Sequence, residues 1–170
     1  MNLKKLIISS LLLAIGLILH QVSPALFLGM RPDFLLAMMF IALYITKDYK
    51  SSLIIGIIAG FLTAATTTFP GGQIPNIVDK IVTAHVLYVF FKVAENKLNC
   101  QITMAVASIL GTLVSGCVFL GSALVLFSLP APFSTLFLTV VLPACAINIA
   151  ATLILFKAIK NALRRCSAIQ

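Results

Sequence analysis

Six long apolar stretches, separated by short polar ones, dominate the 170-residue chain and leave it few ways to fold. Because 61% of the residues are hydrophobic and 9% are charged, a water-soluble domain would have to leave much apolar surface in water. We therefore expect an all-α integral membrane protein, a single domain over residues 1–170 with six transmembrane helices. The apolar runs cover roughly Leu6 to Val22, Phe34 to Thr46, Leu53 to Phe69, Val82 to Phe91, Ile102 to Leu129 and Phe133 to Phe156.

The second and fourth runs are shorter than the roughly 20 residues that a helix needs to cross a bilayer. They reach that length only if the helices continue over the polar residues before them, from Pro24 to Asp33 and from Ile74 to Lys80. Polar side chains would then lie inside helix ends or clefts. These two places are where we expect a site.

The basic residues sort to one side of a six-span arrangement. Only Arg31 and Lys80 fall on the other side, so the positive-inside rule predicts that both termini are cytoplasmic. This placement favours contact with anionic membrane lipid or a cytoplasmic partner over binding to nucleic acid, despite the net charge of +8. The residues on the cytoplasmic side are Lys4, Lys5, Lys47, Lys50, Lys92, Lys97, Lys157, Lys160, Arg164 and Arg165.

The motifs of several kinds of chemistry are missing. The sequence has no P-loop and no His-Glu-x-x-His or Cys-x-x-Cys motif, so we expect neither an enzyme nor a cofactor, and any ATP energy would come from a partner. The four cysteines are scattered, and we expect no disulfide and no metal site. Four acidic residues offer little material for a proton relay, which disfavours a proton-driven carrier.

The outer side carries its charges as two close pairs, Arg31 with Asp33 and Asp79 with Lys80. The second pair ends the segment Phe69 to Lys80, FPGGQIPNIVDK, in which prolines, glycines and amides interrupt the apolar pattern. Both pairs can be read as interfacial anchors. They can also be read as the two partners that a zwitterion needs in a pocket of low dielectric constant, where charge-assisted hydrogen bonds are strong.

A helix that begins near Pro75 would place Asn76, Asp79, Lys80 and Thr83 on one face. Its free N–H groups and positive dipole end would suit a carboxylate, although a helix start with nothing bound would use the same residues. Gln73 lies just before this face.

Other candidates carry two readings each. Asn148 either links helices or contacts substrate. Thr63, Thr66, Thr67 and Thr68 either bond their own helix or face the pocket. His20 and His85 are either packing or interfacial residues or ligands. An apolar stripe either forms a wall for a large side chain or belongs to the plain core, and its members are Phe27, Met30, Phe34, Met38 and Phe69.

Small residues four apart permit close approach of helices. We interpret Gly56 with Gly60, and Gly111 with Ser115, as internal packing positions. Ser10 and Ala14 show the same spacing in the first run, beside a basic end, where a second membrane protein could dock.

Three motifs together resemble the bacterial tryptophan transport protein family: Leu28 to Asp33, Phe69 to Lys80, and Val141 to Ala144. The likeness runs nearly end to end. These proteins look like the substrate-binding S components of energy-coupling factor transporters, which the resemblance describes as six-helix bundles with both termini inside and a ligand pocket near the outer face. A scaffold membrane subunit and two cytoplasmic ATPases drive import in that class.

The resemblance implies tryptophan uptake across a bacterial plasma membrane. It also implies that Ser10 and Ala14 match an alanine pair that meets the scaffold, although the serine departs from the pattern. Self-sufficient secondary transport and a non-transporting assembly role are the alternatives. We expect Arg31 or Lys80 to hold the carboxylate and Asp79 or Asp33 the ammonium. Gln73, Asn76 or a threonine would accept the indole N–H.

Overall fold

The computed structural model describes residues 3–23, 33–95, 97–127 and 129–167, with the backbone alone for 164–167. Every regular element in these ranges is helical, which confirms the predicted all-α fold. Six separate helical segments are formed, because the last three elements run on without a break. The elements are α1 (Leu3–Val22), α2 (Phe34–Thr46), α3 (Tyr49–Thr66), α4 (Gln73–Ala94), α5 (Cys100–Leu126), α6 (Phe133–Leu136), the π-helical turn η2 (Phe137–Val141) and α7 (Leu142–Ser167).

The two short apolar runs behave differently. Helix α4 begins at Gln73 and so takes in the polar segment before Val82, as its length required. Helix α2 begins at Phe34 because Asp33 caps it: the Asp33 side chain accepts a hydrogen bond from the Leu36 amide at 2.9 Å. Helix α2 therefore stays at 13 residues.

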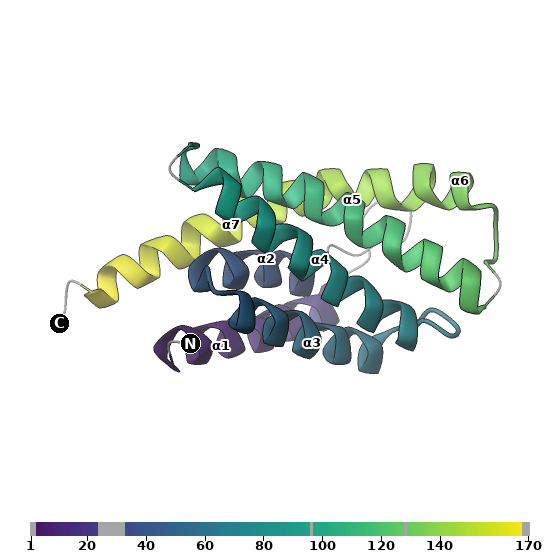
Figure 1. Cartoon of the computed structure of the whole chain (residues 1–170), viewed down its shortest axis with the longest axis horizontal. Coiled ribbons are helices and arrows are strands. Elements are labelled where there is room, and N and C mark those ends of the chain that lie inside the picture. Colours follow the sequence, from purple (N-terminus) through teal and green to yellow (C-terminus); the bar gives the residue numbers. More distant parts are fainter. Residues whose placement is uncertain (1–2, 24–32, 96, 128, 168–170) are drawn as a thin grey trace.

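Successive helices run up and down, so their ends gather at two ends of the bundle (Figure 1). Both termini lie at one end, together with the α2–α3 and α4–α5 connections (Figure 1). The α3–α4 and α5–α6 connections lie at the other end, which we call the loop end; the first is the terminus end. Helix α2 is the centre of the core, since ten of its residues are buried. A helix that is apolar all round is expected to be enclosed in this way.

Glycines set how closely the helices approach. A Cβ at Gly56 would lie 2.6 Å from the Cβ of Ala84, and one at Gly60 would lie 3.0 Å from the Cα of Ile77. The glycines therefore let α3 lie directly against the start of α4. At Gly111 a Cβ would meet the ring of Phe40 at 2.6 Å. These contacts confirm internal packing for Gly56, Gly60 and Gly111, whereas Ser115 lines a cavity.

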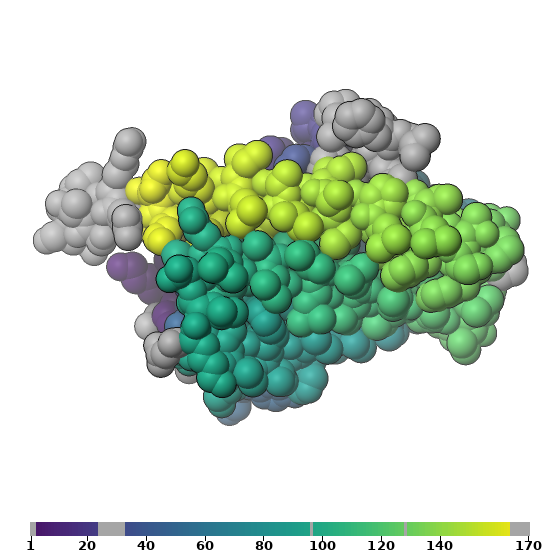
Figure 2. Space-filling view, turned by 90° about the horizontal axis from the view of Figure 1, so that it is seen from above, coloured from purple at the N-terminus to yellow at the C-terminus, as the bar shows by residue number. Residues whose placement is uncertain are grey.

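The last helix changes register at η2, beside a proline. The Leu142 amide bonds to the Phe137 carbonyl five residues back, and Pro143 has no N–H to offer to the turn before it. A widened turn absorbs this missing donor. Beyond the turn, α7 runs alongside α5 over one face of the molecule (Figure 2).

Within the described residues, four helices are long and apolar enough to cross a membrane: Leu3–Val22, Tyr49–Thr66, Cys100–Leu126 and Phe133–Leu163. Helix α2 is apolar but shorter, and α4 carries the polar segment. The structure thus supports membrane insertion and a helical bundle.

Candidate functional site

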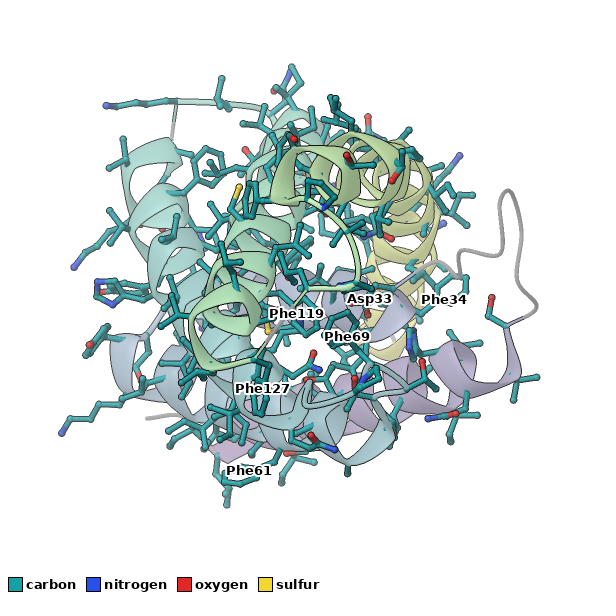
Figure 3. All side chains as sticks on the ribbon, turned by 90° about the vertical axis from the view of Figure 1, so that its right-hand side faces the viewer. Asp33, Phe34, Phe61, Phe69, Phe119 and Phe127 are labelled. Carbon is teal, nitrogen blue, oxygen red and sulfur yellow. The ribbon has the colours of Figure 1, made fainter. Side chains whose placement is uncertain are left out.

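A cavity of roughly 400 Å³ opens near the loop end, between the start of α2 and helices α4, α5 and the last helix. Figure 3 looks onto this end and shows Asp33, Phe69 and Phe119 around its centre. The size is in the range of small-molecule sites. The lining residues are Asp33, Leu36, Thr67, Phe69, Asn76, Asp79, Lys80, Thr112, Ser115, Gly116, Phe119, Leu120, Leu136, Val140, Val141, Ala144 and Asn148.

One wall of the cavity is a buried ion pair with neutral partners. The Lys80 ammonium pairs with Asp79, and both side chains are at most 3% exposed. Ser115 donates to Asp79 Oδ2 at 2.9 Å and accepts from Lys80 Nζ at 3.3 Å. Thr83, one turn further along α4, donates to Asp79 Oδ1 at 3.0 Å. A buried pair needs such extra hydrogen bonds to offset desolvation. Because these hydrogen bonds hold both side chains in place, the Asp79–Lys80 pair is a fixed dipole in the cavity wall.

A second polar group joins the start of α2 to α5 and α7. The Asp33 amide donates to Asn148 Oδ1 at 3.0 Å, and Asn148 donates to Thr112 Oγ1 at 3.4 Å. The Asp33 carboxylate also lies 3.8 Å from His20 Nδ1 on α1. Asn148 thus links helices, which confirms one of its two predicted roles. It also lines the cavity. The substrate-contact reading stays a prediction.

Another part of the lining is apolar and aromatic. Phe69 and Phe119 meet edge to face with ring centroids 5.3 Å apart. Gly116 allows the last helix to come close, because a Cβ there would lie 2.5 Å from Val141 Cγ1. The widened turn at η2 supplies Val140 and Val141 to this wall. The cavity therefore has a charged side and a side suited to a flat apolar ring.

Most of the residues expected from sequence gather here. Six line the cavity, and their role in binding stays a prediction: Asp33, Phe69, Asn76, Asp79, Lys80 and Asn148. Thr83 is fully buried behind Asp79 and acts on the cavity through it. Gln73 is the first residue of α4 and is exposed, outside the lining. Arg31 lies outside the described residues.

The apolar stripe that was expected to form either a cavity wall or plain core divides between these two readings. Met38 is 2% exposed and packs in the core against α1, and Phe34 is absent from the cavity lining. Phe27 and Met30 lie outside the described residues. Phe69 alone of the described members lines the cavity. Most of the apolar lining comes from α5 and the last helix, whereas the start of α2 contributes Asp33 and Leu36.

The threonines and His85 differ in whether they bond or pack within the bundle or line the cavity. Thr63 and Thr66 donate to carbonyls of their own helix, whereas Thr67 lines the cavity. His85 meets the Tyr49 ring away from the cavity, with centroids 5.6 Å apart.

Sequence reasoning missed most of the α5 contribution. Thr112, Ser115 and Phe119 recur at spacings of three and four residues, which places them on one helical face. A polar and aromatic stripe in an otherwise apolar run was the available signal. It was obscured because Ser115 also fits a small-residue packing pattern.

These features define the class of the protein: apolar helices, four of them long enough to span a bilayer, enclose a cavity with charged and aromatic walls. Comparison with known proteins gives the family. Residues 2–164 match the family described as "Tryptophan transporter TrpP", and the chain belongs to it. It is a multi-pass bacterial membrane protein of a transport family, not an enzyme.

Three curated relatives carry the name "Probable tryptophan transport protein". The protein from Clostridium acetobutylicum is 51% identical over 164 residues, covering 96% of each chain. Those from Clostridium perfringens and Bacillus subtilis are 46% and 41% identical, each covering 98% of this chain and 96% of the relative. No solved structure matches the chain significantly.

Proposed function

We propose that this chain binds tryptophan from outside the cell and delivers it to the cytoplasm as the S component of an ATP-driven energy-coupling factor transporter. The observation that carries the proposal is the cavity, in which both signs of charge face an aromatic pair. A zwitterion with a flat apolar ring requires both features. Membership of the tryptophan transporter family supports this ligand.

The hydrogen-bond inventory suggests how the ligand lies. Lys80 has three N–H donors, and the described contacts use two of them, on Asp79 and Ser115. The third is available to the ligand carboxylate. Asp33 is the second acid of the cavity, and we assign the ammonium to it. The indole ring then lies against Phe69 and Phe119.

The orientation follows from the charges at the two ends. Eight described lysines lie at or beside the terminus end: Lys4, Lys5, Lys47, Lys50, Lys92, Lys97, Lys157 and Lys160. By the positive-inside rule this end is cytoplasmic, and six spans place the cavity near the outer face. A ligand would enter from outside.

The coupling to ATP rests on a partner. The chain has no P-loop, and Ser10 and Ala14 are both exposed on α1, as a docking face for a scaffold subunit requires. We propose that this scaffold and two cytoplasmic ATPases complete the transporter. The chain itself supplies the binding step.

Two measurements on purified protein test the proposal. Calorimetry is expected to show binding of tryptophan that is at least about tenfold tighter than that of tryptamine or indole-3-propionate, each of which lacks one charge. Proteoliposomes containing this chain alone are expected to bind tryptophan without accumulating it. Accumulation without ATPases would favour the self-sufficient carrier, and no binding at all would favour an assembly subunit.

Replacing Phe119 by Ala is expected to weaken tryptophan binding about tenfold. The change removes one ring of the edge-to-face pair and part of the apolar wall, which together contribute about 1.4 kcal/mol. Phe61→Ala is the matched control, because Phe61 is 60% exposed and points away from the cavity at the same end (Figure 3). Calorimetry on both variants decides, and equal losses would refute the ring position.

A further inference from the structure

A second hollow, which we call the inner groove, lies at the terminus end of the bundle. It has a volume of about 320 Å³ and is formed by the end of α2, the start of α5 and the end of α7. The proposed function does not use it. The lining residues are Ile41, Tyr44, Ile45, Cys100, Phe156, Ile159, Lys160 and Leu163.

The walls of the inner groove are apolar and well ordered by ring contacts. Tyr44 packs edge to face against both Phe91 and Phe156, with each pair of centroids 5.5 Å apart. Ile41 and Phe156 are buried, whereas Leu163 is 37% exposed. The groove therefore has a closed apolar floor and an apolar rim.

One cation sits at the rim. Lys160 Nζ lies 5.9 Å from the centre of the Phe156 ring and donates a hydrogen bond to Cys100 Sγ at 2.9 Å. None of the lining residues is acidic. Glu95 lines a neighbouring hollow that shares Tyr44 with the groove, and it is paired with Lys47 at 2.8 Å. Lys160 has donors left for an anion from outside the chain.

The charges in the inner groove differ in one decisive way from those in the proposed tryptophan cavity, which we call the outer cavity. The outer cavity offers both a cation and two acids, whereas the inner groove offers a cation alone. The ammonium of an amino acid would find no partner there and would lie close to Lys160. The groove is therefore suited to a molecule with one negative head and an apolar body.

We propose that the inner groove binds an anionic phospholipid of the cytoplasmic leaflet, with an acyl chain against Ile41, Tyr44 and Phe156 and the phosphate on Lys160. Three observations favour lipid as the occupant. The groove is apolar, it opens where the membrane-spanning helices end, and basic residues surround that end. Such a lipid would hold α2, α5 and α7 together at the face nearest the cytoplasm.

The reactivity of Cys100 reports occupancy without any change to the groove. We expect a neutral maleimide to label Cys100 at least about fivefold more slowly in vesicles of phosphatidylcholine with phosphatidylglycerol than in phosphatidylcholine alone. A cysteine introduced by Ala162→Cys, exposed beside the groove, corrects for the lower surface pH of anionic vesicles. Equal slowing at Cys100 and at the introduced cysteine would overturn the proposal.

Inorganic phosphate distinguishes a lipid from a free anion. Added to phosphatidylcholine vesicles, it is expected to leave Cys100 labelling unchanged, because a phosphate alone does not fill an apolar groove. Protection by phosphate would overturn the assignment to lipid.

Lysine variants test the headgroup contact. We expect Lys160→Gln to retain about fivefold less phosphatidylglycerol than the unaltered protein in native mass spectrometry, and Lys160→Arg to retain it. Lys157→Gln is the matched control, since Lys157 is exposed on the same helix and outside the groove lining. An equal loss in Lys157→Gln would show diffuse attraction to the surface and refute a specific site. None of these readouts uses tryptophan, so their outcome is independent of the proposed transport role.

Discussion

Replacing Asp79 by Asn together with Lys80 by Met is expected to weaken tryptophan binding by about 100-fold or more. The double change removes the buried ion pair from the cavity wall, and with it the charged donor for the ligand carboxylate. Hydrogen bonds to charged groups contribute about 1.5–3 kcal/mol each, and 100-fold corresponds to about 2.7 kcal/mol. Calorimetric titration with tryptophan measures the change.

The double variant is preferable to either single one. Removing one partner alone leaves the other charge buried and unpaired, which costs about 3–5 kcal/mol of stability. Replacing both leaves no such charge, so the protein is expected to stay folded. A matched control is Lys47→Met with Glu95→Gln, which removes the exposed pair at the terminus end. Unchanged affinity in the Asp79 and Lys80 double variant, or equal losses of affinity in both double variants, would show that Asp79 and Lys80 are not part of the binding site.

Local pattern was enough to predict the helices. Helix α4 took in the polar segment before Val82, as a span of full length required, whereas α2 kept the bounds of its apolar run at 13 residues. The polar face of α4 followed from helical spacing alone. The side chains of Asn76, Asp79 and Lys80 are buried in the bundle, and the ion pair contacts Ser115 of α5. Spacing within one helix predicts which residues share a face.

Contacts between helices could not be predicted in the same way. Thr112, Ser115 and Phe119 belong to the site because α5 crosses α4 at Lys80, and Val140 and Val141 belong to it because a widened turn before Pro143 brings them inward. Met38 was left open between cavity wall and core, and it lies in the core because α2 is enclosed by other helices. The sequence predicts which segments are helical more readily than it predicts which helix faces contact one another.

Replacing Ala14 by Trp is expected to abolish tryptophan uptake in cells that contain the proposed scaffold and ATPases, with binding by the purified chain unchanged. Ala14 lies exposed on α1, one turn from Ser10, and only small residues let a second helix approach closely at such a position. A tryptophan side chain there would separate the two proteins by the width of its ring. Transport of radiolabelled tryptophan and calorimetry measure the two properties separately.

Ala150→Trp serves as the control for this prediction, because Ala150 is also an exposed alanine within a long helix and lies on α7 instead of α1. It is expected to leave both uptake and binding near the unaltered level. Uptake that persists in Ala14→Trp would show that α1 is not the docking face. Loss of binding together with uptake would mean that the substitution disturbs the bundle, because α1 packs closely on α2, whose first turn carries Asp33 into the cavity. Only loss of uptake with binding intact assigns α1 to the energy-coupling contact, since the cavity and the exposed face of α1 are separate surfaces of one chain.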